Sequence, residues 1–157
     1  MISYKQALKI LKKSKILIKN EIIKTNDCLN RVVANTIKSN TNNPSEDNAA
    51  FDGFVINSKE TKKLNKRNNK LFKIIGTIAA GDKPKNKKIK RFQTFEIMTG
   101  GLIPKEFYTI IPIEQIVFYP KKKNPKYILI DKKINKYQYV RFKGSDYKKN
   151  DLLIKKG

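Results

Sequence analysis

Residues 46–56 read EDNAAFDGFVI, and here a polar loop gives way to a segment rich in β-branched and aromatic residues. Asp52-Gly53 between apolar neighbours is typical of a sharp turn, because glycine supplies the positive φ that many tight turns need. The acids Glu46, Asp47 and Asp52 are unexpected in a chain with 36 Lys+Arg against 13 Asp+Glu. Two interpretations stay open: an ordinary turn with polar flanks, or a place where the chain meets a ligand.

Downstream, to about residue 135, short apolar runs alternate with turns that contain glycine and proline. Their β-branched and aromatic composition predicts strands. The runs span residues 54–57, 71–81, 92–98, 108–113, 115–120 and 127–131. No helical pattern lies between them, so their regular spacing predicts a small barrel- or sandwich-like β domain.

Upstream, the pattern is helical. Ser3 and Gln6 form a capping-box pattern that predicts a helix over residues 3–14. Asp27 can cap a second helix, whose apolar face would comprise Leu29, Val32 and Val33. The fold class that follows is α+β, mainly β: a short helical N-terminal segment with an inserted small β-barrel or sandwich-like domain.

The composition limits the classes of function. One cysteine and no histidine argue against an internal disulfide and a zinc site. No apolar run reaches membrane-spanning length and no signal-peptide pattern opens the chain, so a cytoplasmic protein without a membrane partner is expected. The net charge of +23 comes mostly from dispersed lysines rather than arginines. This spread disfavours a dedicated nucleic-acid role, although charge-driven adhesion to polyanions stays an alternative.

Two further turns could carry chemistry. Thr99-Gly100-Gly101 follows a strand-like run, and its backbone N–H groups with the Thr99 hydroxyl could cup an anion. It is not a Walker A loop, because no Gly-Lys-Ser/Thr closes it. Asp146 lies in a Gly-Ser-Asp turn. Taken singly, each is equally compatible with a plain turn.

The order of these blocks is more specific than any one of them. They read PSEDNAAFDGFVI (44–56), GTIAAGD (76–82), FEIMTGGLIP (95–104) and VRFKGSDYKKNDLLIKKG (140–157). In this order they resemble the N-terminal part of the molybdopterin molybdenumtransferase family, which is related to the E domain of gephyrin. The resemblance covers essentially the whole chain.

The resemblance implies an architecture and an activity. Residues 1–42 with 138–157 would form a discontinuous, elongated dimerisation region, and residues 43–137 an inserted β-rich domain. Enzymes of the family insert molybdate-derived metal into adenylylated molybdopterin, with Mg²⁺, in molybdenum cofactor biosynthesis. Their active site lies between the inserted domain of one protomer and a third domain of the other, which implies a homodimer.

The resemblance also assigns residues by position. Asp52, Thr99 and Asp146 match family positions of the active site and are the candidate catalytic residues. Gly100 and Gly101 are the candidate cofactor-binding residues, and Asp52 is expected to support Mg²⁺ indirectly.

The sequence also departs from the family pattern. Ala49, Phe51 and Phe54 stand where the family has serine, methionine and tyrosine, which removes two hydroxyls. Motifs of the family's third domain are not found, so the 157 residues alone are expected to lack turnover. A partner similar to molybdopterin adenylyltransferase could complete the site. The alternative is a non-catalytic, dimerising scaffold of cofactor synthesis.

Overall fold

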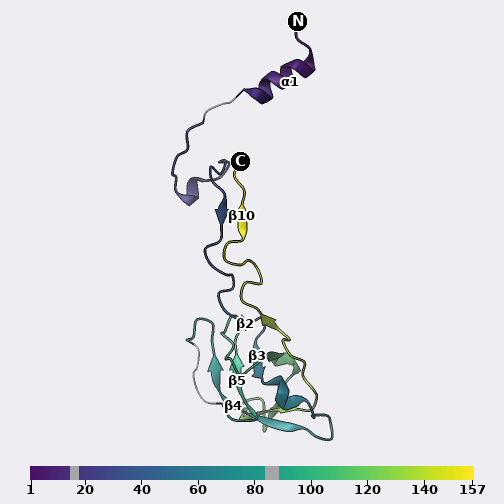
Figure 1. The fold of residues 1–157 in the computed structure, drawn as a ribbon. Coiled ribbons are helices and arrows are strands. Elements are labelled where there is room, and N and C mark those ends of the chain that lie inside the picture. Colours follow the sequence, from purple (N-terminus) through teal and green to yellow (C-terminus); the bar gives the residue numbers. More distant parts are fainter. Residues whose placement is uncertain (15–17, 84–88) are drawn as a thin grey trace. The chain divides into compact units, whose positions relative to one another are not determined.

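The computed structural model describes residues 1–14, 18–83 and 89–157 (Figure 1). The chain divides into two compact units: unit 1 is Met1–Ile37 with Leu152–Gly157, and unit 2 is Lys38–Asp151. These limits differ from the expected 42/43 and 137/138. The reason is that residues 140–147 are bonded to unit 2, for example through the Tyr147 carbonyl oxygen, which accepts from the Asn43 N–H at 2.9 Å.

Unit 2 is built on a curled half-barrel sheet of six strands in the order β6-β3-β5-β4-β8-β7 (Figure 1). The strands are β3 Gly53–Ile56, β4 Lys70–Ile78, β5 Gln93–Ile97, β6 Thr109–Pro112, β7 Val117–Tyr119 and β8 Tyr127–Ile130. Only β4 and β5 pair in parallel; the other pairs of this sheet are antiparallel. Each of the six predicted runs overlaps one of these strands, so the α+β, mainly β class is confirmed.

Both faces of β3, an interior strand of this sheet, are covered. Phe54 and Ile56 belong to one apolar cluster and Val55 to the other, as the twofold alternation of a strand requires. The registers agree, because Val55 lies opposite Ile110 of β6 and Phe95 of β5 in the second cluster. Burial on both faces explains why residues 54–56 are apolar without interruption.

Gly53 is needed for a different reason from the one that its turn motif suggests. It opens β3 and is not among the residues with positive φ. A Cβ at this position would lie 2.1 Å from the carbonyl oxygen of Ile111. Gly53 therefore permits β3 and β6 to approach closely, and the expectation of a positive φ here is wrong.

Three short 3₁₀ helices and four short strands complete the described elements. The 3₁₀ helices are η1 Thr25–Asp27, η2 Ser58–Thr61 and η3 Ile113–Gln115. In unit 2, β2 (Asn48–Ala49) pairs with β9 (Val140–Arg141). β10 (Leu152–Ile154) pairs with β1 (Ile37–Lys38), whose first residue closes unit 1.

Unit 1 contains the predicted first helix, α1, Tyr4–Lys13, and Ser3 and Gln6 form both bonds of the capping box. The second predicted helix is wrong, since Asp27 ends the single 3₁₀ turn η1. Asn30 follows with φ 61°, which cannot continue a right-handed helix, and Leu29 stays exposed. Across the described ranges, no helix has the length and apolarity to cross a membrane.

Candidate functional site

The Asp52 carboxylate and the Thr99 turn meet at one end of the sheet in unit 2. Asp52 Oδ1 accepts the Thr99 N–H at 2.6 Å and the Thr99 hydroxyl at 2.7 Å. β3 and β5 are adjacent and antiparallel, so the residue before β3 lies beside the turn that follows β5. The Asp52 carbonyl oxygen also accepts the Ile113 N–H at 3.0 Å, which anchors its backbone. The structure therefore brings together two of the three candidate catalytic residues.

These bonds favour the ionised form of Asp52. The Thr99 backbone N–H, and then its hydroxyl, lower the pKa of Asp52 from its ordinary value of 3.8, while desolvation acts weakly in the opposite direction. Asp52 is exposed, so its carboxylate is an accessible, fixed negative charge at neutral pH.

The Gly-Gly turn is fully engaged within the protein. The Gly100 N–H donates to the Ala49 carbonyl oxygen at 2.9 Å, and the Gly101 N–H donates to the Met98 carbonyl oxygen at 2.8 Å. The donors expected to cup an external anion thus have internal acceptors, and the anion that Thr99 receives is the Asp52 carboxylate. Gly101 is also confined, because a Cβ there would lie 2.9 Å from the Met98 carbonyl oxygen. The two glycines belong to the turn that positions Thr99 beside Asp52. A contact of these glycines to a cofactor stays a prediction.

Asp146 belongs to a separate group of contacts. Its Oδ2 accepts the Asn43 side-chain amide at 3.1 Å and forms an ion pair with Arg141. Its N–H donates to the Asn43 carbonyl oxygen at 2.9 Å. These contacts join residues 43 and 141–146, whereas Asp52 is bonded to Thr99. The contacts of Asp146 are those of a residue that orders the backbone.

The other two acids of the opening stretch also hold the backbone together. Asp47 Oδ1 accepts the Lys143 N–H at 2.8 Å, and Glu46 Oε1 pairs with the Lys143 ammonium at 3.0 Å. These two acids therefore hold Lys143 in place, and of the three acids only Asp52 is seen to bond to the Thr99 turn.

The fit to a divalent cation rests on a single carboxylate. Within the described ranges, no group of three or more potential His, Cys, Asp or Glu ligands occurs. Both side-chain hydrogen bonds of Asp52 that the structure records use Oδ1, and the residue is exposed, so Oδ2 is the oxygen that could serve as one ligand. Mg²⁺ keeps several waters and commonly takes one or two carboxylates together with substrate phosphates. Asp52 fits such a partial, substrate-completed site.

Two hollows lie on the described part of unit 2, and the smaller one includes Pro112, which lies opposite Gly53. The larger, of about 840 Å³, is lined by Leu102–Tyr108, by residues near Val140, and by Glu46, Asp47 and Lys143. The smaller, of about 200 Å³, lies beside η3. Neither Asp52 nor Thr99 is among the described residues that line them. The Asp52 carboxylate is thus exposed and lies outside both hollows.

Sequence reasoning missed the residues that hold the site region together, chiefly Asn43, Arg141 and Lys143. Asn43 lies near the start of unit 2 in the sequence and Arg141 near its end, and both side chains contact the Asp146 carboxylate. A basic residue five positions before an acidic one in a turn was the only local signal. The hydrogen bond from Asn43 to Asp146 joins residues 103 positions apart, and no local sequence pattern predicts it.

Comparison with known families decides the ancestry. The family model described as "MoeA N-terminal region (domain I and II)" matches residues 2–157. The chain belongs to the MoeA N-terminal family. The blocks around Asp52, Thr99 and Asp146 thus lie inside a match that covers nearly all of the sequence.

Curated relatives of this MoeA N-terminal chain are molybdopterin molybdenumtransferases. It is 27% identical over 156 residues to the Staphylococcus epidermidis protein, covering 99% of the chain and 36% of the relative. The Staphylococcus aureus protein is 29% identical over 129 residues, covering 82% and 29%, respectively. The Bacillus subtilis protein is 26% identical over 137 residues, covering 87% and 31%. The chain thus spans about a third of the length of these relatives.

Solved structures agree with the fold. A molybdopterin biosynthesis moeA protein from Pyrococcus horikoshii OT3 superposes with a TM-score of 0.87 at 25% identity, covering all of the chain and 40% of that protein. A second structure of a Pyrococcus moeA protein gives a TM-score of 0.80 at 27% identity, with 98% and 38% covered. The MoeA N-terminal chain therefore has the fold of domains I and II.

Proposed function

We propose that this chain supplies the Asp52–Thr99 half of a molybdopterin molybdenumtransferase site. In this role it takes part in the transfer of molybdate-derived metal to adenylylated molybdopterin during molybdenum cofactor biosynthesis in the cytoplasm. The observation that carries the proposal is the ionised, exposed Asp52 carboxylate, which accepts hydrogen bonds from two Thr99 donors. Both residues lie inside the family match over residues 2–157.

The open geometry supports a shared site. An exposed carboxylate that lies outside both hollows cannot enclose a pterin or a nucleotide by itself. A second surface is needed to exclude water, and the third domain of a partner protomer, or an adenylyltransferase-like protein, would supply it. In this arrangement Mg²⁺ would be held by substrate phosphates and waters, with Asp52 Oδ2 as a direct or water-mediated ligand.

Exposed apolar surface in unit 1 supports the proposed homodimer. None of its described residues is buried, and large side chains such as Leu11, Ile22 and Leu153 face outward. Such surface commonly marks an interface. A second copy of the chain is the partner that the resemblance implies.

The test is a chimera in which residues 2–157 replace the matching region of the Bacillus subtilis relative. Metal transfer is measured as molybdenum insertion into adenylylated molybdopterin. The chimera is expected to be active, and Asp52→Asn is expected to lower the rate by at least about a hundredfold, as loss of an electrostatic group at a reacting centre does. Lys122→Gln, distant in the sequence from the site blocks, is the control and should leave the rate unchanged.

Two outcomes would contradict the proposal. A folded but inactive chimera would indicate that this chain has lost the catalytic surface and favour the scaffold alternative. An active chimera that tolerates Asp52→Asn would remove Asp52 from the site.

A further inference from the structure

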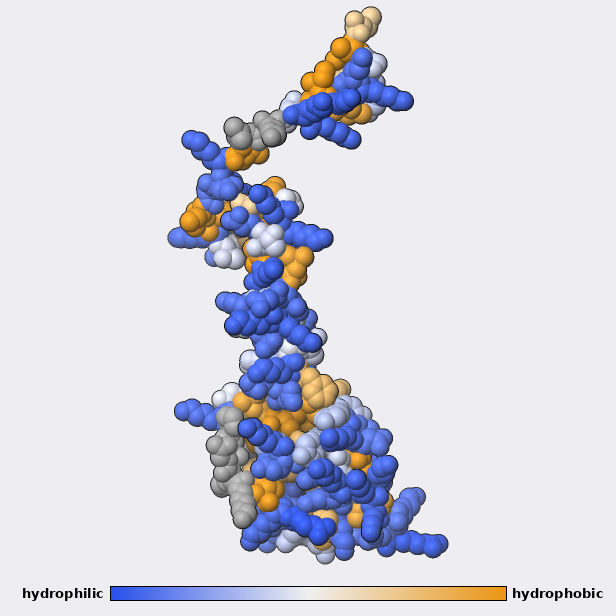
Figure 2. All heavy atoms as spheres, viewed as in Figure 1, coloured by the Kyte–Doolittle hydropathy of each residue, from blue (hydrophilic) through white to orange (hydrophobic). Residues whose placement is uncertain are grey.

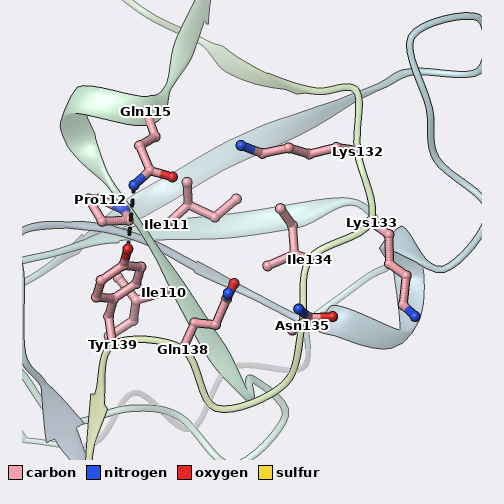
Figure 3. Close-up of a pocket in the computed structure, with 10 residues that line it drawn as sticks. All are labelled: Ile110, Ile111, Pro112, Gln115, Lys132, Lys133, Ile134, Asn135, Gln138 and Tyr139. Carbon is pink, nitrogen blue, oxygen red and sulfur yellow. Dashed lines mark hydrogen bonds between the residues drawn. The ribbon is translucent and has the colours of Figure 1, made fainter.

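The smaller hollow of unit 2 is a polar pocket with an apolar floor. It has a volume of about 200 Å³ and lies where β6 and η3 meet the segment 132–139 (Figure 3). Ile110, Ile111 and Ile134 form a buried floor. The polar groups around it come from Gln115, Lys132, Asn135, Gln138 and Tyr139. None of the described residues that line it is acidic. The pocket therefore offers positive charge and hydrogen-bond donors to a ligand.

Two buried threonines hold one wall of the pocket. The Ile134 N–H donates to the Thr61 hydroxyl at 3.0 Å, and the Gln138 N–H donates to the Thr109 hydroxyl at 3.1 Å. The Gln138 carbonyl oxygen in turn accepts the Ile110 N–H at 3.0 Å. Both threonines are 0% exposed. The backbone of an irregular segment is thereby fixed at two points, which sets the positions from which its side chains project.

The backbone on both sides of Gln138 has an unusual conformation. Tyr137 and Tyr139 have φ values of 68° and 56°, in the left-handed region that bulky residues rarely adopt. Their rings are held by edge contacts to Phe142 and Phe51, respectively, with centroids 5.4 and 5.1 Å apart. Backbone strain of this kind concentrates at functional sites. Here it accompanies a Gln138 side chain that points into the pocket (Figure 3).

The two lysines beside the pocket differ in direction. Lys132 reaches across the pocket towards Gln115, whereas Lys133 points away from the centre (Figure 3). Gln115 is itself oriented by a long contact from its Nε2 to the Tyr139 hydroxyl, at 3.5 Å. One ammonium and three side-chain amides thus surround a space without a carboxylate.

Size and charge together define the ligand class. The volume is below the roughly 300–1,000 Å³ of pockets for drug-sized ligands and equals about six or seven water volumes. A small anion with several acceptor atoms matches both the space and the donors.

We propose that this pocket binds a small oxyanion of the phosphate type, with Lys132 as the charge partner and the amides of Gln115, Asn135 and Gln138 as donors. The site uses neither Asp52 nor Thr99, and it is a second binding site on unit 2 beyond the proposed metal-transfer surface. It differs from diffuse attraction to the +23 chain because it needs one particular lysine.

The test uses the intact, ¹⁵N-labelled 157-residue chain, titrated with inorganic phosphate at constant ionic strength. Saturable NMR shifts are expected at the side-chain amides of Gln115, Asn135 and Gln138. Lys132→Gln should weaken binding about tenfold, as loss of one charged hydrogen bond does. The charge-matched control, Lys122→Gln, should bind phosphate as the unchanged chain does. Gln138→Leu, at an exposed position, should weaken binding less than Lys132→Gln and leave the melting temperature unchanged.

Equal weakening by Lys132→Gln and Lys122→Gln would overturn the proposal, as would shifts that spread over the lysine-rich surface without saturation. Asp52→Asn should bind phosphate normally. The outcome is therefore separate from that of the metal-transfer test, which depends on Asp52.

Discussion

Units 1 and 2 both contain periodic apolar residues, yet only unit 2 buries them. Unit 2 encloses two apolar clusters on opposite faces of β3, and Phe72 and Val55 are 0% exposed. In unit 1 the helix α1 has no buried residue, and Figure 2 shows apolar side chains on its surface. A helix of 10 residues is marginal alone, because most helical stability in proteins comes from tertiary packing. The difference teaches that an apolar pattern becomes a core only when a facing element completes it.

Truncation of the unit 2 core should have the largest effect. Phe72→Ala removes a fully buried ring that packs edge-on against Phe92, and it should lower the free energy of unfolding by about 3–5 kcal/mol. Urea denaturation followed by circular dichroism measures the change. Leu29→Ala in unit 1 is the control and should cost less than about 0.5 kcal/mol. Similar costs for the two variants would break the contrast between the units.

Gly53→Ala tests the close approach of β3 and β6. The added methyl would meet the Ile111 carbonyl oxygen, so a loss of about 1–3 kcal/mol is expected from forced backbone movement. Gly81→Ala is the comparison: its Cβ would meet open space, but its φ of +84° imposes strain. Thermal unfolding of both variants separates the causes. A lower cost at Gly53 than at Gly81 would contradict the steric explanation.

Asp52 should titrate below its ordinary pKa of 3.8. Because its folded-state pKa is lowered, its contribution to stability is present above the unfolded pKa and disappears as the pH falls through the folded value. The stability of the unchanged chain should therefore fall relative to Asp52→Asn as the pH drops from about 5 to below 3.8. A ¹³C NMR titration of the Asp52 carboxyl group measures the pKa directly.

Thr99→Val sharpens this test, because it removes the hydroxyl and keeps the backbone donor, which is the larger cause of the shift. The pKa of Asp52 should rise part of the way towards 3.8 and stay below it. A full return to 3.8 would show that the hydroxyl, and not the backbone, lowers the pKa.

At concentrations too low for self-association, Leu11→Ala in α1 should have the smallest effect on unfolding, less than about 0.5 kcal/mol, because this side chain is 68% exposed in the single chain. Sedimentation velocity over a range of concentrations shows whether the same change weakens self-association. A large loss of stability that depends on protein concentration would show that α1 is buried by a second copy, in agreement with the proposed dimer.

Elements specified by nearest neighbours could be predicted from the sequence. The six strands of the sheet follow from β-branched and aromatic runs between turns, and the start of α1 follows from Ser3 and Gln6. Asp27 has the same capping chemistry as Ser3, but in the described structure its 3₁₀ turn is not continued by a helix, since Asn30 adopts a positive φ and Leu29 is exposed. Local propensity was sufficient only where the following residues agreed with it.

The ordered motifs alone determined the family and identified Asp52, Thr99 and Asp146 as candidates, because motif order is a property of the chain. Tertiary structure alone decided their partners: Asp52 joined Thr99, 47 positions away, while Asp146 joined Asn43, 103 positions away. It also decided that Thr99 binds the protein's own Asp52 carboxylate and that Lys132 and Gln115 face one pocket. The physical reason is that hydrogen bonds act over about 3 Å in space, and strand order, which no single segment encodes, sets which distant residues come that close.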